Sequence, residues 1–230
     1  MDFFNSLIEN ANELLGSLPQ KSYQYNKNKA CEDLGYNQVI LQRDTAFELS
    51  GTGFNLITSN NIDDEIVVVG NDLDEIKSDC KFARISLIQI EDTADEQKAY
   101  NLIRKIEYVK YHYFPDGYMI RTTSRSHKEA VRVSKKAVKN GLTFERVGNL
   151  LINKYKENPA VKSVKVIFVT NQSTNFNSLN TLAEKNNQIT ETLNHIMNNV
   201  NFDCSTCNLK PICDEVEGMK ELHFKTSMGK

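Results

Sequence analysis

The sequence predicts an α/β protein, a layered sheet covered by helices. Residues 66–69 and 83–90 are apolar enough to be strands that are covered on both faces. Residues 164–170 form the clearest strand pattern, and segments with helical spacing of apolar residues separate these runs. Strands that alternate with helices favour a sheet with helices packed across it.

Composition and charge describe an ordinary globular chain of one compact domain or two small ones, with 230 residues, 40% hydrophobic and 25% charged. The net charge of -2 provides no basic field for a nucleic-acid duplex. No run reaches the roughly 18 apolar residues needed to cross a bilayer, and the first residues lack the cationic segment of a secretory signal. We therefore expect a cytoplasmic protein with no nucleic-acid and no membrane partner.

The chain divides into three parts by pattern. Residues 1–38 form an N-terminal helical segment, because apolar residues recur every three or four positions until Gly16 and Pro19. A polar stretch over residues 20–29 follows this helix. Residues 39–200 carry the α/β pattern, and residues 201–230 form a cysteine-containing C-terminal tail.

Shorter signals assign the remaining elements. Three short strands over 38–41, 46–49 and 54–57, punctuated by Gly51 and Gly53, predict hairpins or sheet edges. A further strand is expected over 118–123. Helices are expected over 93–114, 127–139, 143–158 and 177–200, and Thr93, Ser126 and Thr143 are suited to cap the first three of them.

Four stretches together carry a family resemblance. They are FPDGYMIR at 114–121, VRVSK at 131–135, VKVIFVT at 164–170 and CSTCNLKPICDEVEGMKELHF at 204–224. The chain resembles the middle domain of the acetyl-CoA synthase subunit of the carbon monoxide dehydrogenase complex. The last stretch is the most specific, since it extends over more than twenty residues and contains three cysteines. The resemblance implies the α/β fold of that domain and a place in one-carbon metabolism.

The resemblance also implies a nickel, nickel, iron–sulfur centre, held by a later cysteine motif and a Cys-Gly-Cys tripeptide. The sequence contains no Cys-Gly-Cys before its last residue, Lys230. Square-planar nickel held by two thiolates and the intervening amides cannot be built from other residue types. We therefore expect a stand-alone accessory domain that does not make acetyl-CoA by itself. The alternative is one subunit of a split enzyme, completed in trans by a chain that carries the nickel cluster.

The cysteine tail offers a third interpretation, a small zinc or iron–sulfur protein. The candidate metal ligands are Cys204, Cys207 and Cys213, with Asp203, Glu215 or His223 as a fourth ligand. A strong zinc pattern needs a second cysteine pair or paired histidines. The incomplete ligand set favours structural or redox-labile thiols over a metal site.

A basic cluster between residues 121 and 139 is the candidate binding site. The candidate cofactor-binding residues are Arg121, Arg125, Ser126 and Arg132. Arginine forks and the free N–H groups of a helix that begins after Ser126 would suit phosphate. The resemblance implies CoA as the ligand, because an arginine-rich cleft of the family's middle domain is associated with CoA, and subunits of the complex as partners. The chain has no tryptophan to stack on adenine, which leaves Tyr113 or Tyr118. The alternative is a solvated helix face, which the lysines of the cluster favour.

Overall fold

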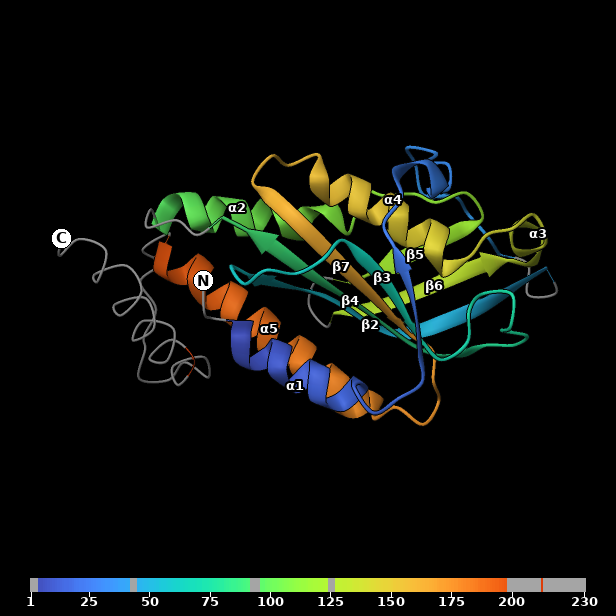
Figure 1. Ribbon diagram of the computed structural model, residues 1–230, viewed down its shortest axis with the longest axis horizontal. Helices are drawn as coiled ribbons and strands as arrows, with labels where there is room; N and C mark the ends of the chain where they lie inside the picture. The colour runs from blue at the N-terminus through green and yellow to red at the C-terminus, as the bar shows by residue number, and fades with distance from the viewer. Residues whose placement is uncertain (1–3, 42–44, 92–95, 124–126, 198–211, 213–230) are drawn as a thin grey trace.

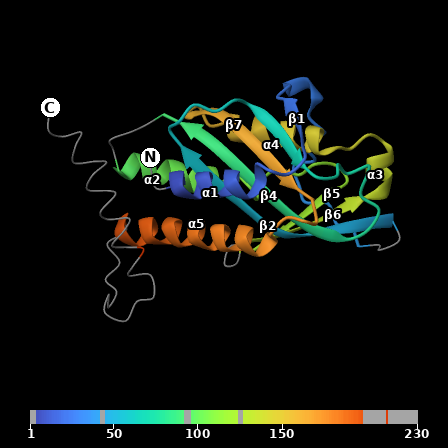
Figure 2. The same ribbon diagram turned by 60° about the horizontal axis from the view of Figure 1, so that its bottom comes forward.

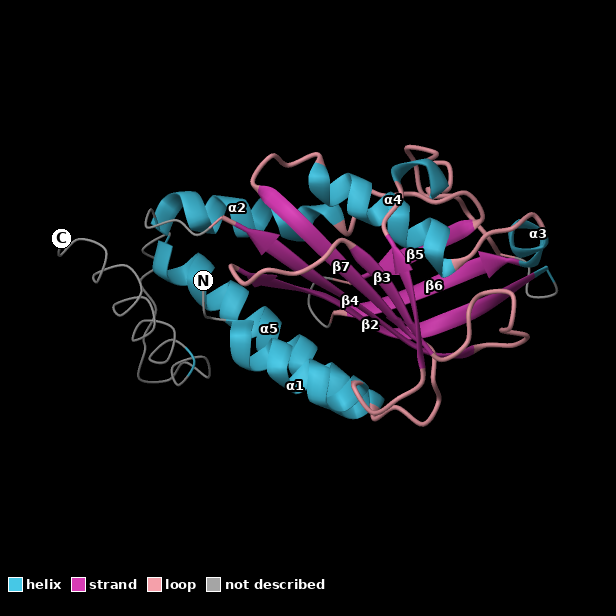
Figure 3. Cartoon of the chain, in the orientation of Figure 1, coloured by secondary structure: helices cyan, strands magenta, loops and turns pink. Residues whose placement is uncertain are grey.

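The computed structural model describes residues 4–41, 45–91, 96–123, 127–197 and 212. Within these residues the chain forms one seven-stranded mixed sheet with helices on both faces (Figure 1). This architecture confirms the predicted α/β class. Figure 3 shows the strands fanning out between the two helical layers, with most connections at the ends of the sheet.

The strands lie in the order β1-β3-β7-β4-β2-β6-β5. Their bounds are β1 Gln20–Gln24, β2 Ala46–Thr58, β3 Glu65–Val69, β4 Cys80–Ile90, β5 Tyr118–Thr122, β6 Lys128–Ser134 and β7 Val161–Val169. The pairs β2–β4 and β3–β7 are parallel, and the other four pairs are antiparallel. The strands β7, β4 and β2 therefore form the centre of the sheet. The apolar run over 83–90 predicts this place for β4, whereas β3, predicted to be central as well, lies second from the edge.

Two helical layers cover the sheet. The helices are α1 Asn5–Leu15, α2 Glu96–Val109, α3 Lys135–Lys139, α4 Phe144–Lys156 and α5 Phe176–Met197, with a short 3-10 turn over Lys27–Lys29. The helices α2 and α4 lie over one face, and α1 and α5 lie side by side over the other (Figures 1 and 2). Among the described residues, no helix has both the length and the apolar character needed to span a membrane.

The helix predictions are confirmed where capping and burial agree. The helix α1 ends where Gly16 donates a backbone hydrogen bond to Asn12, 2.8 Å from nitrogen to oxygen, and it buries Leu7 against the rest of the core. Thr143 caps α4, since its hydroxyl accepts a hydrogen bond from the Arg146 N–H. Under α4, the rings of Phe144 and Phe168 stack with centroids 4.5 Å apart.

The three short strands predicted before residue 58 are confirmed only in part. Residues 46–49 and 54–57 belong to a single long strand, β2, and residues 38–41 form no strand. The strand β2 continues through Gly51 and Gly53. At each of these positions a neighbour leaves no room for a side chain. A Cβ atom at Gly51 would overlap the carbonyl of Phe82, and one at Gly53 would overlap the carboxylate of Glu129. The strand is thus central rather than an edge.

The helix predicted over 127–139 is also wrong. Residues Lys128–Ser134 form β6, and only Lys135–Lys139 are helical. Alternation decides this segment, because Glu129, Val131 and Val133 point inward between exposed or half-buried neighbours. Ser134 rather than Ser126 caps the short helix, with its hydroxyl accepting from the Ala137 N–H.

The polar residues Gln20–Gln24 form β1, an edge strand that the sequence does not predict. The strand pairs antiparallel with β3, and nearly all its side chains are exposed. An edge strand with both faces in solvent carries no apolar alternation, so the periodicity that identifies other strands is missing here.

Candidate functional site

A cavity of about 430 Å³ lies between the C-terminal end of α2 and the edge strand β5. Its volume is in the range of sites that bind small molecules. Its walls combine two cations, two tyrosine rings and several smaller side chains. The lining residues are Asn37, Lys110, Tyr111, Tyr113, Phe114, Ile120, Arg121 and Thr122.

Local structure holds both walls in place. The chain leaves α2 in a tight turn, in which His112 donates a backbone hydrogen bond to Val109. On the other wall, the Asn37 side chain pairs with the backbone of β5 as a strand would. Its Nδ2 donates to the Ile120 carbonyl at 2.6 Å, and its Oδ1 accepts from the Ile120 N–H at 3.1 Å. This side chain closes the hydrogen-bonding edge of β5 beside the cavity.

The cavity has a positive character. The Arg121 side chain is exposed and forms no ion pair or hydrogen bond with the described residues, while its backbone pairs with β6. Lys110 is buried and pairs with Glu107 across 2.8 Å, and its ammonium also lies 5.2 Å from the centre of the Tyr111 ring. A free guanidinium at the rim and a second cation deeper in the wall suit an anionic ligand.

The structure brings only part of the predicted phosphate site together. Arg121 and Tyr113 line the cavity, whereas Arg132 does not and is held elsewhere. The Arg132 guanidinium pairs with Glu48 at 2.9 Å and donates to the carbonyl oxygens of Ile40 and Leu41, which ties that segment to the sheet.

Of the other parts of the phosphate prediction, the role of Arg125 and Ser126 stays a prediction and the helix start is wrong. Arg125 and Ser126 lie outside the described residues. The helix N-terminus expected after Ser126 does not form there, because the following residues are strand β6. The site therefore depends on side chains rather than on a helix dipole.

A buried ion pair lies next to the cavity, and the sequence analysis missed it. Arg84 of β4 and Glu129 of β6 are both fully buried, with Nη2 and Oε2 2.8 Å apart and a second contact of 2.9 Å from Nε to Oε1. Nη1 of Arg84 donates to Asn55 and Ser86, and the Tyr155 hydroxyl donates to the same Asn55 oxygen. The sequence signal for this pair is Arg84, a charged residue within the run 83–90 that is expected to be covered on both faces.

Electrostatics keep the Arg84 guanidinium charged and the nearby phenols neutral. Burial lowers the pKa of Arg84, but the Glu129 carboxylate outweighs burial and holds that pKa above its ordinary value. Burial raises the pKa of Tyr113 well above its ordinary value, and Glu129 raises it further. The Tyr113 and Tyr118 hydroxyls find no hydrogen-bond partner among the described residues. Tyr113 thus joins the wall of the cavity to the surroundings of the ion pair.

The described cysteines do not fit the metal centre that the family resemblance implies. Burial raises the pKa of the Cys31 thiol to about 12, and burial also raises the pKa of Cys80, so neither is a thiolate at neutral pH. No three histidine, cysteine or acidic side chains converge within the described part of the chain. The predicted ligands Cys204, Cys207 and Cys213 lie outside it, and their metal binding stays a prediction.

A comparison with protein-family models identifies the fold around this cavity. The model of the CO dehydrogenase/acetyl-CoA synthase complex beta subunit matches residues 35–174, more than half of the chain. The chain belongs to this family. A search of the curated proteins found no match. The beta-subunit match covers the whole cavity, both residues of the buried ion pair and the strands from β2 to β7. It ends before the cysteine tail, so the resemblance at 204–224 stays a prediction.

Proposed function

We propose that this member of the beta-subunit family is a cytoplasmic accessory module that binds the phosphate groups of CoA and has no nickel–iron–sulfur centre of its own. The observation that carries the proposal is the Arg121 guanidinium in the cavity wall, which no described side chain or carbonyl engages. Arginine binds phosphate through two parallel hydrogen bonds, and an arginine without a carboxylate partner is available for that geometry.

Other residues that line the cavity have further roles in the same proposal. The Thr122 hydroxyl supplies a donor beside Arg121, and Lys110 adds positive charge from the α2 side. Tyr113 and Tyr118, considered above for adenine, are fully buried, so neither ring can stack on a ligand. Tyr111 is half-buried in the cavity wall, and we assign the stacking surface to its ring.

The proposal is tested by titrating CoA and dephospho-CoA into the full chain by calorimetry. Loss of a charge-assisted contact of about 1.5 to 3 kcal/mol weakens binding roughly ten-fold or more, so Arg121→Ala should do so. Arg121→Lys should recover only part of the affinity, because a lysine cannot form the bidentate contact. Lys139→Ala removes an exposed cation outside the cavity and should bind CoA as the unaltered chain does.

Two further arms of the titration sharpen the result. Binding should weaken with added salt, as expected for a contact that is open to solvent. Weaker binding of dephospho-CoA would assign Arg121 to the 3′-phosphate, and equal binding would assign it to the pyrophosphate. Absence of binding at millimolar CoA would contradict the proposal.

A second candidate function is the split enzyme, in which a partner chain supplies the nickel cluster. An apolar surface beside β5 favours it, since Tyr36, Val39 and Leu41 are 62%, 72% and 71% exposed. These residues lie in the family match. The isolated chain should make no acetyl-CoA from CO, a methyl donor and CoA, whereas a mixture with a nickel-carrying synthase subunit should. Val39→Ser with Leu41→Ser should abolish that gain but leave CoA binding intact. If this chain mixed with the nickel-carrying subunit makes no acetyl-CoA, the split-enzyme hypothesis is contradicted and the accessory role is the function that stays.

A further inference from the structure

His127 is held in a conformation that few residues other than glycine adopt. It immediately precedes β6 and has a φ of 45°, which lies in the left-handed region. Its carbonyl accepts hydrogen bonds from the Gly53 N–H at 3.0 Å and from the Thr52 hydroxyl at 2.9 Å. These two contacts with β2 hold the backbone, so the position of the imidazole ring is set by the central sheet. Strain that the surroundings maintain in this way is often found at functional positions.

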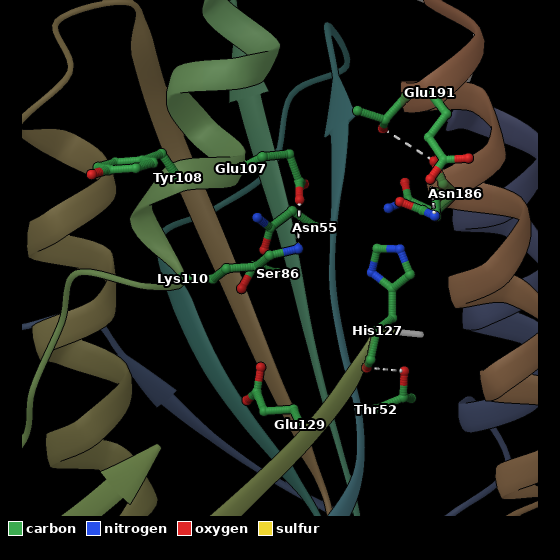
Figure 4. A network of polar contacts seen from close by, with 12 residues as sticks. Thr52, Asn55, Ser86, Glu107, Tyr108, Lys110, His127, Glu129, Asn186 and Glu191 are labelled. Carbon is green, nitrogen blue, oxygen red and sulfur yellow. Dashed lines mark hydrogen bonds and ion pairs between the residues drawn. The ribbon is translucent and has the colours of Figure 1, made fainter. Parts of the chain in front are cut away.

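The ring of His127 faces α5, where the Asn187 amide is the one described side chain with a hydrogen-bonding influence on it. The side chain is 4% exposed, and neither ring nitrogen makes a well-formed hydrogen bond with a described residue. Figure 4 shows the ring pointing toward Asn186 of α5. Asn186 is 1% exposed, and both its amide atoms also find no partner among the described residues. The site therefore contains an acceptor, Oδ1 of Asn186, that suits a ring carrying an additional proton.

Charged groups approach His127 from both helices packed against it. Lys110 and Glu107 come from the end of α2, whereas Glu191 and the amide of Asn187 come from α5. Burial is the largest influence and lowers the pKa of His127, and Lys110 lowers it further. Asn187, Glu107 and Glu191 act in the opposite direction. The ring is thus neutral near pH 7, in a setting where one added negative charge would favour its protonated form.

Lys110 connects this histidine to the cavity, because the same side chain lines the cavity wall and opposes the charge of His127. We propose that an anion bound beside Arg121 and Lys110 causes His127 to take up a proton from the solvent. The proposal rests on the proposed function, since it needs an anion in the cavity. The proton forms a new N–H bond on the ring and is supplied by the buffer, so no other reactant is required. The imidazolium then donates to Asn186 and links the start of β6 to α5.

Thermodynamic linkage makes this proposal measurable. If binding takes up a proton, affinity must rise as the pH falls toward the pKa of the free protein. Calorimetry of CoA binding near pH 6.5, in buffers with different heats of ionisation, measures the number of protons exchanged. We expect net uptake for the unaltered chain. His127→Asn should abolish the part of the uptake due to the ring and still bind CoA, since asparagine tolerates a positive φ.

The controls separate the histidine from other titrating groups. The phosphate monoester of CoA titrates near pH 6 itself, and the difference between the unaltered chain and His127→Asn removes its contribution. His112→Asn alters an exposed histidine outside the cavity and should exchange protons as the unaltered chain does. If His127→Asn does not fold, NMR of the unaltered chain replaces it. The chemical shifts of the His127 ring protons, followed against pH with and without CoA, give the change in the pKa of His127 on binding.

Each outcome decides one claim. A rise in the pKa of His127 on CoA binding, or proton uptake that His127→Asn removes, supports the proposal. CoA binding with no such rise, or with the same uptake in His127→Asn, overturns the proposal and leaves the proposed function standing. Absence of CoA binding overturns both.

Discussion

Arg84 of β4 and Glu129 of β6 form an ion pair across a third strand, because β2 lies between β4 and β6 in the sheet. Gly53 of β2 makes this contact feasible, because its missing side chain leaves the space through which the two side chains meet. A Cβ atom at Gly53 would overlap the Glu129 carboxylate and lie 3.0 Å from Nη2 of Arg84. The glycine in the middle of a buried strand is therefore part of the ion-pair site.

Gly53→Ala should destabilise the chain strongly, because the new methyl group displaces a carboxylate that is buried against its only cationic partner among the described residues. Breaking a buried ion pair costs about 3 to 5 kcal/mol. Gly35→Ala is the matched control, since it has open space but a φ of 72°, and should cost only about 1 to 2 kcal/mol. Chemical denaturation of both variants measures the difference. Equal losses would show that the space at Gly53 is not needed.

Glu129→Gln should lower the free energy of unfolding by about 3 to 5 kcal/mol, because it leaves the buried Arg84 guanidinium without a counter-charge. Arg84→Met combined with Glu129→Leu should be more stable than the single variant, since neither charge of the pair then remains buried. Urea denaturation compares the three proteins. A single variant as stable as the unaltered chain would mean that the pair contributes little.

The pH dependence of stability should include a contribution from His127. The folded state holds its pKa below the usual value of about 6.5, so the unfolded chain binds the proton more readily. His127 therefore contributes to the free energy of unfolding above pH 6.5, and this contribution is lost as the pH falls through the lower pKa of the folded state. Denaturation at pH 7.5 and 5.5, without ligand, should show a smaller acid loss for His127→Asn than for the unaltered chain. An identical loss in both would contradict this assignment.

The cysteine tail gives a prediction that does not depend on the cavity. With three thiols and no assigned fourth ligand, the anaerobically purified chain should contain less than one zinc or iron per molecule. The triple variant in which serine replaces Cys204, Cys207 and Cys213 should then melt at the unaltered temperature in metal-replete buffer. Stoichiometric metal, together with a lower melting temperature of the variant, would establish a structural metal site.

The parts of the fold that the sequence predicts are those in which burial dictates the pattern. The strands β3, β4 and β7 are largely buried on both faces and appear as mainly apolar runs. The helices α1 and α4 combine an apolar face with a recognisable end or cap. The strand β6 was not predicted, because its basic residues were interpreted as one face of a helix. The buried positions alternate along the segment, as they do in a strand.

The candidate site was only partly predictable, since its walls come from distant segments. Arg121 stands out as an arginine at the end of a strand, and the structure places it at the cavity rim. Lys110 and Asn37 gave no signal, because one follows a helix and the other lies just before the segment predicted as a sheet edge, 38–41. Gly53 was interpreted as a turn signal, although a glycine in a strand also marks the close approach of another group.

The central claim, CoA binding in the Arg121 cavity, is tested most directly by mapping amide chemical shifts in a two-dimensional NMR spectrum as CoA is added. We predict that the largest changes fall on Tyr111, Ile120, Arg121 and Thr122, and that Arg121→Ala reduces them at equal ligand concentration. Changes confined to another surface, such as the exposed face of α2 that carries Arg104 and Lys105, or no changes at millimolar CoA, would contradict the account.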